Sequence, residues 1–327
     1  MSKTKAKART ANAPSQYDGL LAAKKKESCK ATILRYIPLY LMMLPGIIYL
    51  ICNNYLPMFG ILIAFKKVNF SIGILESPWS GLKNFEFLFA TKDAWIMIRN
   101  TLAYNIVWIL MGTVIAIFIA LCMAEIAERP IAKLIQPIIC FPSMISAVIL
   151  SFIVYGFLSN TYGFVNRVIL DGNGINWYAS AKYWPFILTI VHFWQSSGQS
   201  SIVYMASIGG IDKSLYESAR LDGASKLKQI WYITLPLLKP MIVLMLLMSI
   251  GRIFNSDFGL FYQVPLNQGL LASTTQTIDT YVYRALMQMN NVGMSSAASV
   301  FQAVLGFVLV IVSNAIVRVV DEDSALF

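Results

Sequence analysis

Long apolar runs separated by short polar stretches constrain the fold of this chain more than any other feature of its sequence. Hydrophobic residues make up 57% of its 327 residues and charged residues only 13%, which is unusual for a water-soluble domain. A helix crosses a bilayer with about 20 mostly apolar residues, whereas the strands of a membrane barrel alternate over roughly 10 residues. The runs here are longer and do not alternate, so the sequence predicts an all-α, polytopic membrane protein.

Six of these runs are predicted to be transmembrane helices. They extend from about Arg35 to Phe59, Trp95 to Ala124, Ile131 to Phe157, Tyr183 to Ile208, Leu235 to Phe254 and Ala297 to Val319. We expect outer segments at residues 60–93 and 255–296, the second built of ordered loops and short helices. The predicted organisation is a basic tail (1–34), a first helix with its outer segment (35–94), a main transmembrane domain (95–320) and a short C-terminus (321–327).

Positive charge is concentrated on one side of these predicted spans. The net charge is +10. Much of the excess lies in the N-terminal tail, at Lys3, Lys5, Lys7, Arg9, Lys24, Lys25, Lys26, Lys30 and Arg35. Further basic residues follow the second and fourth spans, at Arg129, Lys133, Lys213, Arg220, Lys226 and Lys228. The positive-inside rule therefore predicts that both termini are cytoplasmic. The tail is interpreted as a cytoplasmic anchor and not as a nucleic-acid-binding arm.

Catalytic and metal-binding motifs are missing from the sequence. The single His excludes a two-His metal motif, and Cys29, Cys52, Cys122 and Cys140 lack metal-ligand spacing. Neither a Gly-x-x-x-x-Gly-Lys-Ser/Thr phosphate loop nor a Gly-x-Ser-x-Gly nucleophile turn occurs. We therefore expect no catalytic residues, metal or cofactor on this chain, and an energy source on another subunit.

The polar loop between the fourth and fifth spans predicts a short amphipathic helix within residues 212–224. Asp212 or Ser214 can cap its start, and Glu217 lies in the first turns, where the helix dipole favours an anion. Gly223 can adopt the left-handed conformation that commonly ends a helix.

This loop resembles the EAA motif of the permeases of binding-protein-dependent ABC importers. That motif combines Glu-Ala-Ala, Asp-Gly-Ala and Ile-x-Leu-Pro, and the chain has Glu217-Ser218-Ala219, Asp222-Gly223-Ala224 and Ile233-Thr234-Leu235-Pro236. Two further stretches are similar to sugar-importer permeases, namely Gly81-Leu82-Lys83-Asn84-Phe85 and Asn100-Thr101-Leu102. Two more resemble the polysaccharide and oligosaccharide permeases of Gram-positive bacteria, namely Gly210-Ile211-Asp212 and Thr277-Ile278-Asp279-Thr280-Tyr281-Val282-Tyr283-Arg284.

The resemblance implies the fold of a type I ABC importer permease in the bacterial cell membrane, with oligosaccharides or polysaccharide fragments as cargo. It also implies three kinds of partner: a second, different permease subunit, a cytoplasmic dimer of ABC ATPases that holds ATP and Mg²⁺, and an extracytoplasmic solute-binding protein. The loop helix would be the coupling helix that fits a groove on the ATPase. The coupling residues implied are Tyr216, Glu217, Ser218, Ala219, Asp222, Gly223 and Ala224.

Three alternatives to a sugar permease stay open. The same machinery could carry a non-sugar solute. An ion-coupled secondary transporter belongs to another class and would need carboxylates at mid-depth, of which the predicted spans hold no convincing example. A membrane scaffold without transport is the third, although the polar fourth span speaks against it.

Candidate residues for the transport path lie in the fourth span and in the last outer segment. His192, Gln195 and Gln199 share one helical face, with Trp194 nearby. Amides and an indole ring could contact a sugar, but hydrogen bonding between helices explains these polar residues equally, so both interpretations stay open. The outer candidates are Asn255, Asp257, Tyr281, Tyr283 and Arg284.

Overall fold

A computed structural model of the chain describes residues 29–171 and 174–320. The chain divides into two compact units, one up to Phe59 and one from Gly60 onward. In the first unit, α2 (Cys29–Leu50), a π-helical turn (Ile51–Tyr55) and α3 (Leu56–Met58) follow one another directly. Large apolar side chains such as Leu41 and Met42 are exposed along this unit, as expected of a helix that faces lipid or another subunit.

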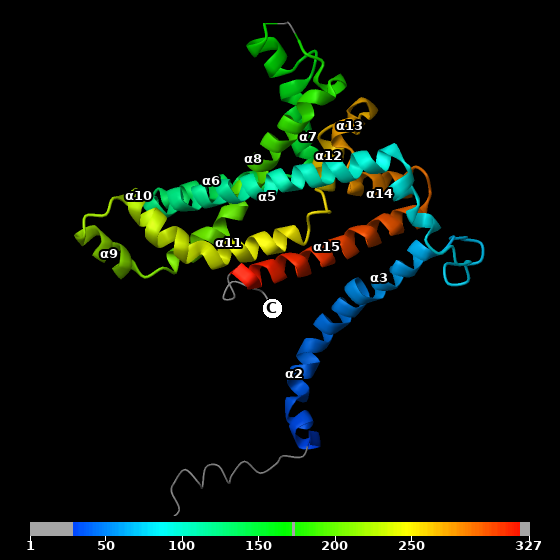
Figure 1. Cartoon of the computed structure of the whole chain (residues 1–327), viewed down its shortest axis with the longest axis horizontal. Helices are drawn as coiled ribbons and strands as arrows, with labels where there is room; N and C mark the ends of the chain where they lie inside the picture. Colours follow the sequence, from blue (N-terminus) through cyan, green and yellow to red (C-terminus); the bar gives the residue numbers. More distant parts are fainter. Residues whose placement is uncertain (1–28, 172–173, 321–327) are drawn as a thin grey trace, which may run out of the picture. The chain divides into compact units, whose positions relative to one another are not determined.

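The second unit is helical through most of its described length (Figure 1). Its α-helices are α4 (Phe87–Ala90), α5 (Lys92–Ile126), α6 (Ala132–Cys140), α7 (Ala147–Leu158), α8 (Trp184–Gly209), α9 (Lys213–Leu221), α10 (Lys226–Gln229), α11 (Leu235–Ile250), α12 (Phe258–Gln263), α13 (Ala272–Thr275), α14 (Ile278–Met287) and α15 (Val292–Val320). Shorter 3₁₀ turns occur at Phe59–Phe65, Lys83–Phe85, Phe141–Met144, Trp177–Ala179, Ala181–Tyr183 and Gly269–Leu271, and π-helical turns at Val165–Ile169 and Ile230–Thr234. The last outer segment therefore contains the short helices α12 to α14, which confirms the prediction for residues 255–296.

Four helical stretches in the described residues are long and apolar enough to cross a membrane. They are Tyr36–Phe65, Lys92–Ile126, Lys226–Ile250 and Val292–Val319. These stretches correspond to the predicted first, second, fifth and sixth spans, most of them extended by several residues. The bent pair Ala132–Met144 and Ala147–Leu158 adds a fifth crossing if it forms one span.

The prediction of one continuous third helix from Ile131 to Phe157 is wrong. The two halves of this segment meet at 94°. Pro137 and Pro142 each remove a backbone donor, and Ser146 then begins a new helix with its side chain accepting a hydrogen bond from the Ile149 amide at 3.4 Å. The apolar pattern continues through this break, so it did not reveal the bend.

The predicted fourth span forms a helix of crossing length but of polar composition. α8 has 26 residues, or about 39 Å at 1.5 Å per residue. Its serines and glutamines keep it outside the set of apolar spans in the described chain. The helix as such was predicted correctly, whereas its membrane crossing stays a prediction.

Part of the core of the second unit forms where α8 packs along α5 and also contacts α6 and α11, and another apolar cluster joins α5, α14 and α15. Figure 1 shows α5, α11 and α15 running alongside one another, and α11 contacts both of the other two helices. Gly198 permits the close approach of α6 to α8, because a Cβ atom there would lie 2.1 Å from the Ile139 carbonyl oxygen.

Candidate functional site

The short helix predicted within residues 212–224 is present as α9, and Asp212 caps its start. The Asp212 carboxylate accepts a hydrogen bond from the Ser214 amide at 2.9 Å. This bond lowers the pKa of Asp212 and satisfies one of the amides that the first turn of a helix leaves unpaired. The prediction of a cap at Asp212 or Ser214 is thereby confirmed for Asp212.

The end of α9 is closed by Gly223, as the sequence predicted. Gly223 has a φ of +76°, and its amide donates to the Arg220 carbonyl at 3.0 Å while the Ala224 amide donates to the Ala219 carbonyl at 2.8 Å. This pair of bonds is a Schellman motif, which requires a left-handed residue that glycine adopts without strain. The buried Gln229 amide donates to the Ala224 carbonyl at 3.0 Å and holds this end in place.

Tyr216 connects α9 to the segment that leads into α11. Its hydroxyl lies 2.9 Å from the Thr234 hydroxyl, and Thr234 is only 3% exposed. Thr234 ends the π-helical turn that passes directly into α11 at Leu235. This contact therefore links α9 to the segment from which α11 begins.

Two ion pairs connect the ends of this loop to the region where α5 ends. Lys213 pairs with Glu128 at 2.7 Å, and Lys226 pairs with Glu125 at 2.7 Å. The hydrogen bond and positive charge of Lys213 lower the pKa of Glu128, and the same contact raises the pKa of Lys213. All four side chains are at least half exposed, so these pairs orient the loop more than they stabilise the fold.

The surface around α9 remains open and partly apolar. Glu217 and Ser218 are exposed, and Leu221 is 89% exposed. Neighbouring exposed apolar side chains are Leu215, Leu227, Trp231 and Tyr232. A capped, anchored helix with apolar side chains in solvent has the properties of a docking surface for another protein.

The candidates on α8 do not converge on one site. The His192 ring stacks on Trp108 of α5, with ring centroids 3.7 Å apart and planes inclined by 7°. The Gln195 amide donates to the Ile145 carbonyl at 3.1 Å and so satisfies a backbone group at the bend between α6 and α7. Trp194 and Gln199, by contrast, are exposed.

Two of the predicted outer residues, Asp257 and Asn255, make hydrogen bonds between a side chain and the main chain. Asp257 caps α12 by accepting a hydrogen bond from the Leu260 amide at 3.0 Å. Asn255 contributes its carbonyl, which accepts a hydrogen bond from the Asn105 side chain at 2.8 Å. Both residues therefore shape the connection between α11 and α12.

The other three outer candidates are on α14 and contact other elements of the outer segments. Tyr281 stacks on Phe87, with ring centroids 5.2 Å apart. Tyr283 packs against Phe258 and Tyr262 of α12. Arg284 donates to the Asn267 side-chain oxygen at 3.1 and 2.6 Å.

Sequence reasoning missed the role of Asp279, although the stretch around it was singled out. One oxygen of its carboxylate accepts hydrogen bonds from the Ser256 amide, the Ser256 hydroxyl at 2.8 Å and the Gln302 side chain at 3.2 Å. Asp279 is on α14, and its partners are in the segment after α11 and on α15. Asp279 thereby connects three elements in the outer part of the unit.

Asn100 and Thr101 also have a structural role that their resemblance to a signature did not specify. The Asn100 amide donates to the Gln276 carbonyl at 3.0 Å, and the Thr101 hydroxyl accepts from the Ile278 amide at 3.1 Å. Both side chains are buried on α5. They fix the outer segment before α14 to the start of a membrane-spanning helix.

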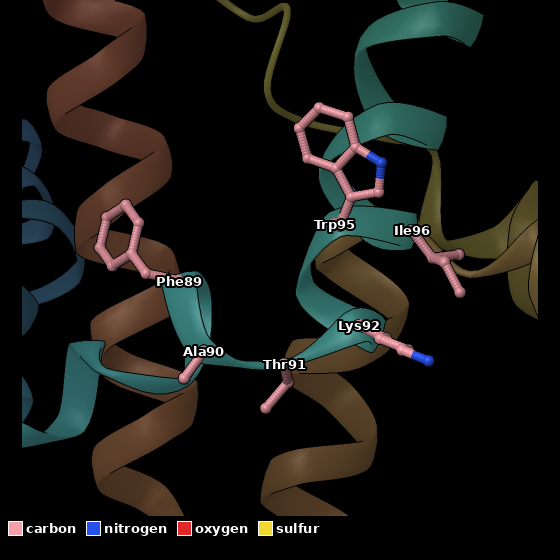
Figure 2. A pocket seen from close by; sticks show the side chains of 6 residues that line it. All are labelled: Phe89, Ala90, Thr91, Lys92, Trp95 and Ile96. Carbon is pink, nitrogen blue, oxygen red and sulfur yellow. The ribbon is translucent and has the colours of Figure 1, made fainter.

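A hollow of about 480 Å³ lies where α4 meets α5. Its lining consists of Phe89, Ala90, Thr91, Lys92, Trp95 and Ile96. Figure 2 shows these side chains pointing in different directions rather than towards a common centre. Specific recognition needs convergent polar groups, so this hollow does not have the geometry of a cargo site.

Comparison with known proteins identifies the family. Residues 112–324 match the family described as binding-protein-dependent transport system inner membrane component. The chain is 33% identical to the polygalacturonan/rhamnogalacturonan transport system permease protein of Bacillus subtilis (strain 168) over 305 residues, which is 92% of this chain and 94% of that protein.

Solved structures agree with this assignment. The crystal structure of a bacterial ABC transporter involved in the import of the acidic polysaccharide alginate contains a chain with a TM-score of 0.80 and 32% identity, covering 89% of this chain and 98% of that one. A second structure, of a bacterial alginate ABC transporter in complex with an alginate pentasaccharide-bound periplasmic protein, gives a TM-score of 0.80 at 31% identity, over 90% of this chain and 98% of that one. The chain therefore belongs to the family of binding-protein-dependent transport system inner membrane components.

Proposed function

We propose that this chain is the permease subunit of an ABC importer for oligosaccharides or polysaccharide fragments, and that α9 couples it to a cytoplasmic ATPase. The observation that carries the proposal is α9 itself, which is capped at both ends, joined to α11 through Tyr216 and open to solvent on its other side. The printed names of the relatives, for polygalacturonan/rhamnogalacturonan and for alginate, support the cargo class.

In this proposal α9 transmits force as a rigid element. A partner ATPase that holds ATP and Mg²⁺ closes and displaces α9 as a unit. The Tyr216–Thr234 contact passes the displacement to α11, and the two ion pairs pass it to the end of α5. α5 and α11 contact each other and α8, so their motion can open the path alternately to each side of the membrane.

The proposed topology has six crossings. Four crossings are the apolar stretches, the fifth is the bent pair of α6 and α7, and the sixth is α8. The length of α8 and its packing along α5 support its inclusion. The ion pairs connect α9 and α10 to the end of α5, which supports one common side of the membrane for these segments. With six crossings, both termini would lie on this same side, which the positive-inside rule makes cytoplasmic.

The proposed partners are a second, different permease subunit, an ATPase dimer and an extracytoplasmic solute-binding protein. On α8, Trp194 and Gln199 are the candidates with exposed side chains for contact with cargo, since His192 and Gln195 contact neighbouring segments. Asn255, Asp257, Tyr281, Tyr283 and Arg284 would shape the outer part of the path.

The coupling role of α9 can be tested with Gly223→Val in the importer reconstituted with its partners. A β-branched residue at a φ of +76° is strained, so the Schellman motif should open and the end of α9 should lose its position. We expect normal membrane insertion but at least a tenfold loss of ATP-driven saccharide uptake. Gly209→Val is the matched control, because Gly209 has free space around it and no positive φ. Uptake by Gly223→Val at the level of this control would contradict the coupling role.

A further inference from the structure

A cavity of about 360 Å³ lies between the segment that follows α7 and the turn that follows α12. Its lining consists of Tyr155, Ser159, Asn160, Thr161, Tyr178, Leu266 and Gln268. The volume is within the range of about 300–1,000 Å³ that is typical of small-molecule sites. Tyr178 precedes the start of α8, whereas α9 follows its end, so the cavity lies on the opposite side of the protein from α9.

The lining combines aromatic rings, hydroxyls and amides and contains no charged side chain. The Tyr155 and Tyr178 rings have centroids 5.6 Å apart and are tilted by 59°. Asn160, Thr161 and Gln268 are exposed and can exchange hydrogen bonds with a ligand. A sugar ring suits such a lining, since its C–H face packs on an aromatic ring and its hydroxyls pair with amides and hydroxyls.

One wall of the cavity is held in place by the buried Asn166. Its amide donates to the Ile175 carbonyl at 3.1 Å, and its side-chain oxygen accepts from the Ile175 amide at 3.3 Å and from the Trp177 ring nitrogen at 2.8 Å. Asn166 is only 2% exposed. These bonds fix the segment immediately before Tyr178, so that the ring of Tyr178 is positioned before any ligand arrives.

The opposite wall is a strained turn that Arg284 stabilises. Leu266 and Asn267 have φ values of +54° and +50°, which are unfavourable for residues other than glycine. Arg284 donates two hydrogen bonds to the Asn267 side-chain oxygen, and the Asn267 amide donates to the Tyr262 carbonyl at 3.1 Å. The turn thereby places Leu266 and Gln268 in the cavity wall.

We propose that this cavity is an outer subsite for one uncharged sugar ring of the cargo. The inference deepens the proposed function and rests on it. No cation lines the cavity to pair with a carboxylate, so a neutral ring should bind there more tightly than a uronic acid unit. Alginate and polygalacturonan, for which two relatives are named, are both acidic polysaccharides, so the subsite here would take a neutral unit of a mixed chain.

A local fluorescence measurement on the full importer in nanodiscs tests the subsite. The four native cysteines are replaced by serine. An environment-sensitive dye is then attached through Tyr162→Cys, because Tyr162 follows Thr161 of the cavity wall and is 78% exposed. Titration with xylotetraose and maltotetraose is expected to give a saturable signal with at least one of the two, and tetragalacturonate is expected to bind at least tenfold more weakly. A dye at Tyr232→Cys, near α9, is the matched control and should not respond.

Thr161→Trp should fill the cavity and abolish the signal, and the double variant Asn160→Ala/Gln268→Ala should weaken neutral-sugar binding at least tenfold. The subsite is disproved if neither neutral sugar gives a saturable signal, if tetragalacturonate binds as tightly, or if both variants titrate like the parent. A loss of affinity only for the solute-binding protein would identify the cavity as a protein-docking surface instead. ATP-driven uptake by the unlabelled importer is measured separately, so failure of the proposed function is distinguishable from failure of the subsite.

Discussion

Single side chains determine how α9 is attached to the rest of the molecule. Tyr216 contacts Thr234 in a buried position, whereas Lys213 contacts Glu128 in solvent. The first contact joins two uncharged hydroxyls, so salt does not screen it. The second contact requires a charged carboxylate and a charged ammonium group, so it depends on pH and on ionic strength. Changing pH can therefore release the ion pair, and strong acid also protonates the Asp212 cap at the same end of α9.

We predict that acidification releases the Lys213 end of α9. The pKa of Glu128 is lowered from its ordinary value of 4.5, so the pair is fully formed above that value and is lost as the pH falls through the lowered pKa. The raised pKa of Lys213 keeps the pair intact until the pH rises above 10.5. The mobility of a spin label at Leu215→Cys, an exposed position next to Lys213, should therefore be constant between these limits, and should increase below the lower limit and above the upper one.

Glu128→Gln should give the mobile spectrum at every pH, because the neutral amide cannot form the ion pair. The matched control is Glu86→Gln, which removes an exposed carboxylate from the outer part of the chain. A label whose mobility increases in acid equally in the parent and in Glu128→Gln would show that the ion pair does not hold this end of α9.

At the scale of elements, the outer ends of α11, α14 and α15 are joined by Asp279. This carboxylate accepts hydrogen bonds from Ser256 and Gln302, two residues on different elements. Gln302 is buried, and Ser256 and Asp279 are partly buried. The network thus adds polar contacts to the apolar packing of α14 against α5 and α15.

Asp279→Ala should destabilise the outer segment. The substitution removes the acceptor of the Ser256 amide, and a buried polar group without a partner costs about 1–3 kcal/mol, whereas the Ser256 hydroxyl still contacts Thr277 and the Gln302 side chain still donates to the Phe254 carbonyl. We expect the midpoint of heat unfolding in detergent to fall by at least about 2 °C. Asp93→Ala, which removes an exposed carboxylate at the start of α5, is the control and should leave the midpoint unchanged. Equal midpoints for the two variants would disprove the role of Asp279.

Local features of these elements could be predicted from the sequence, because their causes lie within a few residues. The cap at Asp212 and the left-handed Gly223 follow from side-chain chemistry and backbone sterics. The bend before Ser146 had local signals in Pro137 and Pro142, but the continuous apolar pattern outweighed them. Composition alone describes how apolar a segment is and not how it is bent.

Contacts between distant segments could not be predicted in this way. The stacking of His192 on Trp108 and the contact of Gln195 with Ile145 depend on how α8 packs against α5 and on the bend between α6 and α7. Helical spacing placed His192 and Gln195 on one face but could not identify their neighbours. Asp279 was missed for the same reason, since its partners come from separate elements.

At the scale of the whole molecule, the chain combines apolar helices with the polar, exposed helix α9, for which we propose the coupling role. Apolar stretches long enough to cross a membrane carry polar contacts at their ends, and those contacts hold α9 on one side and the outer segments on the other. The chain has no phosphate-binding loop of its own, so in the proposed function its movement depends on an ATPase that contacts α9.

The most direct test of this account is affinity purification of the chain from its native membrane after cross-linking through Ser218→Cys on α9, followed by identification of the partners and measurement of ATPase activity. The account predicts a cross-link to an ABC ATPase, a co-purified second permease, and ATPase activity that a saccharide-loaded binding protein stimulates. A chain that purifies alone and moves substrate in proteoliposomes under an ion gradient would contradict it.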